Sequence, residues 1–75
     1  MNESYKGSDL KPGMVFQLTA TTLTIESVTQ IDDHAGKLVL VKYQRLGRNC
    51  VEAMNGESII FADDIFVSAP LVKTP

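Results

Sequence analysis

The sequence predicts an all-β fold, a small barrel of five strands with a 3₁₀ corner before the last strand. Threonine and β-branched residues fill the segments between turns, and these residue types favour strands over helices. Glycine, asparagine and aspartate recur at short intervals, which is typical of tight turns. No segment keeps a helical hydrophobic period over about ten residues, so short strands joined by turns are expected.

The first two strands are expected at 14–19 and 19–31. The turn before them ends in Gly13, a residue that tolerates a positive φ. The apolar alternation of the second strand slips by one residue, and such a slip moves side chains to the other face of a sheet. We therefore expect a bulge near Glu26 and Ser27.

The clearest strand is expected at 37–45, after a loop in which Gly36 is the permissive residue. Its first half is apolar on both faces, which is typical of a strand covered on both sides. Residues 50–61 then predict a hairpin around Asn55-Gly56. Of the possible hairpin registers, the one with a three-residue loop at 54–56 best places apolar side chains on one face and polar side chains on the other. The core expected from these registers is Val39, Val41, Tyr43, Val51, Ile59, Phe61 and Ile65.

Two adjacent acids, Asp63 and Asp64, interrupt the apolar stretch 61–67. Neighbouring strand residues point to opposite faces, so these carboxylates are not expected to converge on one substrate. We interpret them as an exposed corner between the last two strands, with Asp63 capping the turn by accepting a backbone N–H.

The chain has 75 residues, enough for one small domain with a thin margin of stability. We expect a flexible arm at 1–10, a single domain at 11–70 and a tail at 71–75. Cys50 has no partner for an internal disulfide and is expected to be a small buried hydrophobe. Without a leader or a long apolar stretch, the expected compartment is the cytoplasm, and no membrane contact is expected.

Charge is distributed unevenly along the chain, whose net charge is −2. Residues 35–50 carry four basic side chains and no acid, while the acids lie elsewhere. Two readings stay open: a solvated face, or a surface for an acidic protein partner or single-stranded RNA. The residues proposed to contact such a partner are Lys37, Lys42, Gln44, Arg45 and Arg48.

No constellation predicts catalysis, a cofactor or a metal site. Asp32, Asp33 and His34 form the best candidate for a metal, but the ligand spacing of a calcium loop is missing. Turn chemistry explains these three residues without a ligand. The sequence therefore predicts a protein that is not an enzyme.

The chain resembles the first domain of elongation factor P over residues 1–45. The residues that carry the resemblance are Leu10, Lys11, Gly13, Met14, Val15, Phe16, Ile25, Val28, Gly36, Val39, Val41 and Lys42. The resemblance implies an SH3-like barrel of the KOW kind, and short phage-encoded β proteins open in a similar way. The factor carries a Pro-Gly-Lys-Gly-type loop with its modified residue where this chain has the acidic segment 32–36. The resemblance therefore implies a fold and no role in translation.

Three functions are compatible with the sequence. The first is a non-enzymatic binding module, a protein adaptor or a weak RNA binder of the kind that phages or mobile elements encode. The second is a self-assembling β subunit of a homo-oligomer, because exposed edge strands pair readily with other chains. The third, ranked last, is a small metal-dependent enzyme.

Overall fold

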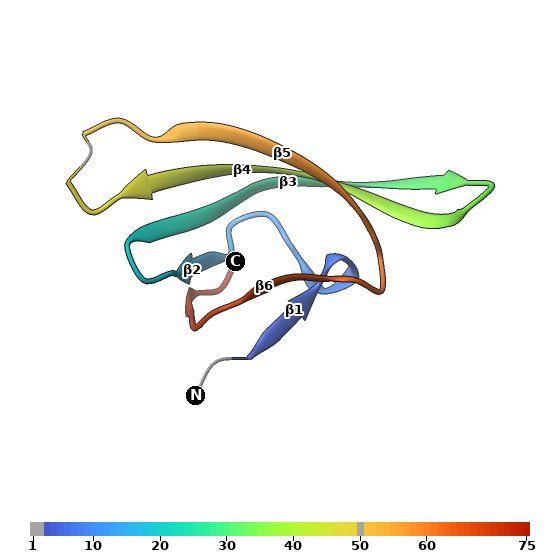
Figure 1. Ribbon diagram of the computed structural model, residues 1–75, viewed down its shortest axis with the longest axis horizontal. Coiled ribbons are helices and arrows are strands. Elements are labelled where there is room, and N and C mark those ends of the chain that lie inside the picture. Colours follow the sequence, from blue (N-terminus) through green and yellow to red (C-terminus); the bar gives the residue numbers. More distant parts are fainter. Residues whose placement is uncertain (1–2, 50) are drawn as a thin grey trace.

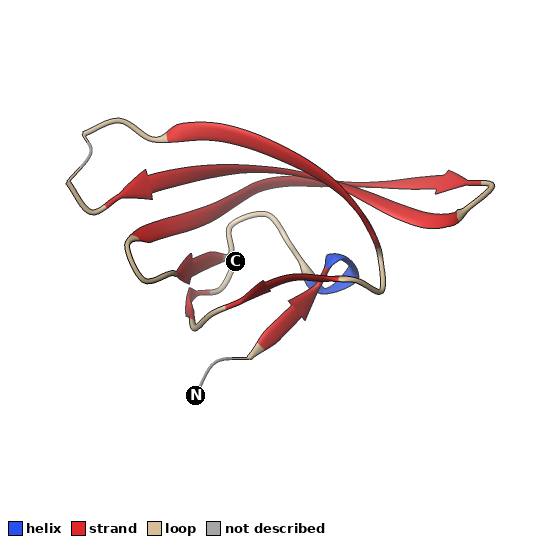
Figure 2. Cartoon of the chain, in the orientation of Figure 1, coloured by secondary structure: helices blue, strands red, loops and turns tan. Residues whose placement is uncertain are grey.

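A computed structural model describes residues 3–49 and 51–75 and confirms the all-β fold (Figures 1 and 2). The described residues form seven strands and one short 3₁₀ helix, two strands more than the sequence predicts. In chain order they are β1 (Ser4–Lys6), the 3₁₀ helix η1 (Gly7–Asp9), β2 (Val15–Gln17), β3 (Thr21–Asp33), β4 (Gly36–Gly47), β5 (Met54–Phe61), β6 (Ile65–Ser68) and β7 (Leu71–Lys73).

The strands form two antiparallel sheets. The larger sheet has five strands in the order β5-β4-β3-β2-β7, and the smaller one pairs β1 with β6. Strands β2 to β5 follow one another as a meander, and the chain then returns to add β7 beside β2. Among the described residues the two sheets are not closed into one barrel.

The core lies between the two sheets. Its buried hydrophobic residues are Leu10, Met14, Phe16, Leu23, Ile25, Val39, Val41, Val67 and Ala69. Phe16 is completely buried, and its ring lies edge-on to the ring of Tyr5 from β1, with centroids 4.9 Å apart. Burial raises the pKa of Tyr5, and so does Glu3, whose carboxylate accepts the Tyr5 hydroxyl's hydrogen bond at 3.0 Å.

Both terminal segments contain ordered elements where the sequence suggests an arm and a tail. Residues 4–9 form β1 and η1, and Leu10 is buried. Near the other end, β7 pairs with β2. Such short strands have little local signal, because the strands that stabilise them lie far away in the sequence.

Several local expectations are confirmed. The pairing of β3 with β4 shifts register between Ile25 and Ser27, where the sequence predicts a bulge. Gly13 has φ of 96° and Gly36 has φ of 128°, so both occupy turn conformations that side chains rarely adopt.

The predicted hairpin loop at 54–56 is wrong. Strand β5 runs straight through Asn55 and Gly56, and it pairs with β4 from Met54 opposite Arg45 onward. Strand β4 ends at Gly47 and β5 begins at Met54, so the connection between them comes before the predicted loop. Gly56 is needed for close approach and not for a turn, because a Cβ at this position would lie 2.5 Å from the ring of Tyr43.

The predicted core is correspondingly only partly right. Val39 and Val41 are buried, and Tyr43 packs against the core from a half-buried position. The remaining members are exposed: Val51 at 98%, Ile59 at 62%, Ile65 at 59% and Phe61 at 44%. The observed register places Ile59 and Phe61 on the opposite face of the sheet from Val39 and Val41. The prediction for Cys50 lies outside the described residues.

The corner between β5 and β6 is confirmed as a turn, but it is not a 3₁₀ helix. Asp64 donates its backbone N–H to the carbonyl of Phe61 at 3.0 Å. Within the described chain the Asp63 carboxylate accepts no hydrogen bond, so the predicted cap is wrong. The N–H groups of the corner have backbone acceptors instead, because Ala62 donates to the Lys37 carbonyl at 2.9 Å and Asp64 to that of Phe61. The helix η1 satisfies the corner's carbonyls, with Gly7 donating to Asp64 and Ser8 to Ala62, each at 3.0 Å.

Candidate protein-binding surface

The β3–β4 hairpin projects from the body of the molecule as an arm (Figure 1). Strand β2 pairs with β3 only at residues 22–24, whereas β3 and β4 stay paired as far as Asp33 opposite Gly36. The arm accounts for the elongated outline of 42 × 27 × 19 Å. Strand β5 follows β4 along the arm as far as Phe61, which lies opposite Leu38.

One face of the arm carries a cluster of apolar side chains. We call it the arm face and define it as Ile31, Leu38, Leu40, Ile59 and Phe61. Ile31 and Phe61 flank Leu38 on the two neighbouring strands, and Ile59 lies opposite Leu40. Residues directly opposite one another share a face, so these five side chains are neighbours.

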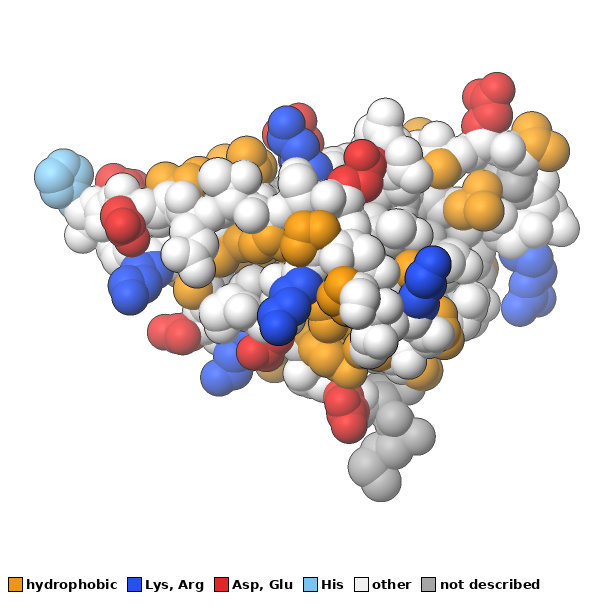
Figure 3. Space-filling view, turned by 180° about the vertical axis from the view of Figure 1, so that it is seen from behind, with side chains coloured by type: hydrophobic (Ala, Val, Ile, Leu, Met, Phe, Trp, Pro, Cys, Tyr) orange, Lys and Arg blue, Asp and Glu red, His pale blue; other side chains and the backbone are white. Residues whose placement is uncertain are grey.

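The arm face lies on the side of the sheet away from the core. Alternation along β4 turns Leu38 and Leu40 away from the buried Val39 and Val41. Ile59 is 62% exposed and Phe61 44%. Hydrophobic side chains are visible on the surface of the molecule in Figure 3. Contiguous apolar surface of this kind is typical of an interaction site.

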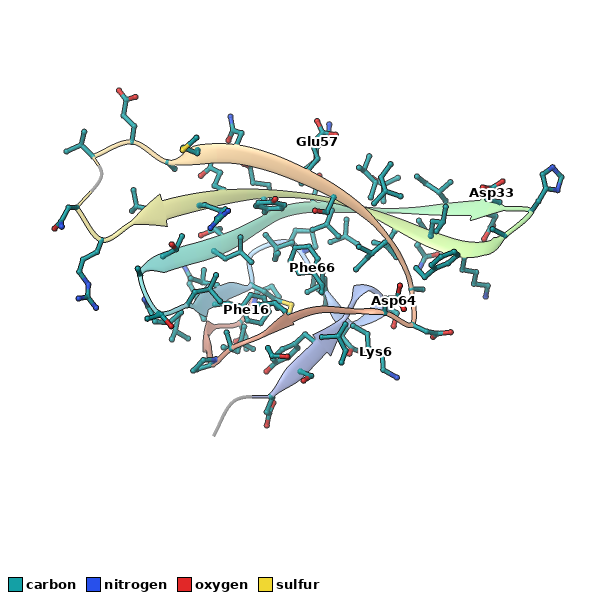
Figure 4. All side chains as sticks on the ribbon, viewed as in Figure 1. Lys6, Phe16, Asp33, Glu57, Asp64 and Phe66 are labelled. Carbon is teal, nitrogen blue, oxygen red and sulfur yellow. The ribbon has the colours of Figure 1, made fainter. Side chains whose placement is uncertain are left out.

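Charged and polar residues border the arm face towards the body. Lys42 on β4 lies opposite Glu57 on β5. On this face of the sheet they form the next pair after Leu40 and Ile59 in the direction of the body. Glu57 points away from the core in Figure 4. At the far end Asp33 lies at the tip of the arm. The apolar cluster therefore has a polar rim, as protein interfaces do.

The structure separates the five residues that the sequence groups as a partner-binding set. All five are exposed. Along β4, alternation places Lys37 and Arg45 on the core side, and Lys42 and Gln44 on the side of the arm face. Arg48 lies in the loop after β4, where its backbone N–H donates to the Ala20 carbonyl at 3.1 Å.

Two of these basic residues have an acid directly across the sheet. Lys37 lies opposite Asp32, and Lys42 lies opposite Glu57. The segment 35–50 looks purely basic in sequence because its acidic neighbours come from other strands. Mixed charge of this kind does not form the continuous basic groove that binds a nucleic acid backbone.

The acidic candidates lie at strand ends and in turns, with Asp32 and Asp33 at the end of β3 and Asp63 and Asp64 in the corner after β5. Asp32, Asp33 and His34 stand at the tip of the arm, where the Asp33 carboxylate accepts the backbone N–H of His34 at 2.7 Å. Across residues 3–49 and 51–75, no group of three His, Cys, Asp or Glu side chains is placed to hold a metal ion.

An open hollow of about 340 Å³ lies on the core side of the sheet, next to the loop after β4. Its lining residues are Thr21, Tyr43, Arg45, Gly47, Glu52, Met54, Asn55 and Gly56. The Tyr43 ring is held between Gly56 and Phe66, and the two rings lie edge-on with centroids 5.9 Å apart. These contacts pack the Tyr43 ring against the core, so it is not free to stack on a ligand.

Comparisons with family models, with curated proteins and with solved structures found no match for this chain. Within the described residues no helix has the length and apolar character needed to span a membrane.

The arm face was not predicted as a site, although the sequence contains a signal for it. The first half of β4 is apolar on both faces, a pattern that predicts a strand covered on both sides. In the structure the core covers Val39 and Val41, while Leu38 and Leu40 remain on the open arm face. Sequence shows that both faces are apolar, but only tertiary structure shows which one lacks a cover.

Proposed function

We propose that this chain is a non-enzymatic binding module whose partner is a protein that covers the arm face. A single observation supports this most strongly. Strand β4 is apolar on both faces, but the described chain covers only one of them. Covering Ile59 and Phe61 with a partner would remove apolar area from water, which is the main driving force of association.

A protein partner fits the surface better than single-stranded RNA does. Non-specific RNA binding uses a basic groove with aromatic side chains on which bases stack. Here the basic residues lie on two faces of β4, and Tyr43 packs against Gly56 and Phe66. RNA binding remains the alternative, and it would use the residues Lys37, Lys42, Gln44, Arg45 and Arg48.

We also propose that the fold is an incompletely closed member of the SH3-like class. The meander β2 to β5, with the last strand returned to the side of β2, supports this assignment. So does the resemblance to the first domain of elongation factor P, which implies the same class of barrel. The acidic arm tip at 32–34 stands where that factor has its functional loop, so the proposed role is binding outside translation. The proposed setting is the cytoplasm, in a phage or mobile-element context.

The test is affinity capture with matched variants. Ile59→Lys places a charge in the arm face at a side chain that is 62% exposed, so folding should survive. Ile65→Lys makes the same change on β6, where the side chain is 59% exposed and outside the arm face. We expect a protein captured by the wild type to be lost by Ile59→Lys and kept by Ile65→Lys.

Far-ultraviolet circular dichroism checks that both variants fold. Equal capture by the two variants would contradict the arm face as the binding surface. Recovery of single-stranded RNA in place of a protein, with loss on Lys42→Glu, would favour the alternative function.

A further inference from the structure

Strand β5 forms an open edge of the larger sheet. Among the described strands it pairs with β4 alone, and Figure 1 shows it along the outside of the sheet. Natural edge strands are usually protected by proline, lysine, bulges or short length. Strand β5 has eight residues, unbroken register with β4, neither proline nor lysine, and one charge at Glu57.

The direction of the free hydrogen-bonding groups on β5 follows from its register. Ala62, just beyond the strand, donates its N–H to the Lys37 carbonyl at 2.9 Å, so that pair is hydrogen-bonded. In an antiparallel ladder such pairs alternate with pairs that have no bonds. The residues that turn their backbone groups to the open edge are therefore Asn55, Glu57, Ile59 and Phe61.

We propose that a second copy of this chain pairs with β5 antiparallel, about a two-fold axis at Ser58. In this register Glu57 faces Ile59 of the second copy, and Asn55 faces Phe61 of the second copy. Each residue whose backbone N–H and C=O point to the open edge then lies opposite another such residue, so the two can hydrogen-bond. The arm faces of the two copies lie on the same side of the joined sheet. A two-fold interface is self-complementary in this way by construction.

The net charges at the two ends of β5 have opposite signs, which supports a copy of the same chain as the occupant. At the Met54 end, Arg45 lies opposite Met54, and Arg48 follows in the loop, which also carries Glu52. At the Phe61 end the corner carries Asp63 and Asp64, with Lys37 opposite Ala62.

An antiparallel pair brings the basic end of each copy to the acidic end of the other, so both contacts are favourable. The pairing ends at two copies, because the opposite edge of the sheet is β7, a strand of three residues that includes Lys73. The arm faces of both copies remain open, so this inference does not depend on the proposed function.

The experiment measures mass by sedimentation equilibrium over a range of protein concentrations at low salt. We expect a dimer for the wild type and a monomer for Glu57→Pro, because proline removes an N–H from the open edge and leaves the β4 ladder intact. Glu57→Ala is the matched control and should remain dimeric. A monomeric wild type, or a dimeric Glu57→Pro variant, would overturn the proposal.

A charge exchange tests the arrangement of the ends. The variant Arg45→Asp with Arg48→Asp should be mostly monomeric alone, and so should Asp63→Lys with Asp64→Lys. Mixed together they should form a heterodimer, because each end then meets its opposite. Failure to associate on mixing, with both variants folded, would rule out this antiparallel arrangement.

Amide hydrogen exchange on the wild type needs no variant. The amides of Glu57 and Ile59 should exchange several-fold more slowly as concentration rises, while the Ser58 amide, which faces β4, stays unchanged. Equal behaviour of the three amides would contradict pairing along this edge.

Discussion

Replacing Phe16 with alanine is expected to remove about 3–5 kcal/mol from the free energy of unfolding, the usual cost of deleting a buried phenylalanine. The Phe16 side chain is fully buried between the two sheets, and it contacts the ring of Tyr5 edge-on. A loss of this size approaches the whole stability of a domain with so few residues. The variant should be largely unfolded or strongly destabilised at room temperature.

Urea denaturation followed by circular dichroism measures this loss, and Phe61→Ala is the matched control. Phe61 is 44% exposed on the arm face, so its truncation should cost only about 1 kcal/mol. The sequence predicts the opposite importance for Phe61, as a member of the core. A larger loss for Phe61→Ala than for Phe16→Ala would return Phe61 to the core and contradict the observed register.

Replacing Gly56 with alanine is expected to cost about 1–3 kcal/mol, the usual penalty of overpacking. The new Cβ would lie 2.5 Å from the nearest ring atom of Tyr43. The ring has little room to move away, because it also packs edge-on against Phe66. In a loop, by contrast, Gly56 would have no such neighbour.

A double-mutant cycle with Tyr43→Leu isolates this contact, since coupling between two changes reports direct interaction. Gly56→Ala should cost clearly less in the Tyr43→Leu background than in the wild type. Additive costs, with no coupling, would show that the ring of Tyr43 does not cover Gly56.

Local sequence signals were sufficient for part of the fold. The β-branched composition predicts the strands, the slip in alternation predicts the bulge after Ile25, and the turn glycines Gly13 and Gly36 have the expected backbone. Val39 and Val41 were also correctly assigned to the core. Each of these features depends on a few neighbouring residues, which is why a single sequence reveals them.

The features that sequence missed depend on distant contacts. Asn55-Gly56 is a strong hairpin signal, but Tyr43 uses the glycine for close packing within a strand. At the corner around Asp63 the N–H groups of Ala62 and Asp64 donate to the carbonyls of Lys37 and Phe61, so no carboxylate cap is needed. The basic residues of β4 are separated by alternation, and two of them, Lys37 and Lys42, lie opposite acids on other strands. None of this is visible in the segment 35–50.

The arm face and the open edge both depend on the pairing of β5 with β4, because that register creates them. Nuclear Overhauser contacts between Hα protons test it directly, since residues of a non-hydrogen-bonded antiparallel pair have Cα atoms only about 4.5 Å apart. We predict contacts between the Hα protons of Leu40 and Ile59, and between those of Leu38 and Phe61. A spectrum in which Ile59 instead contacts Val51 across a loop at 54–56 would contradict the register, and with it the binding surface proposed for this protein.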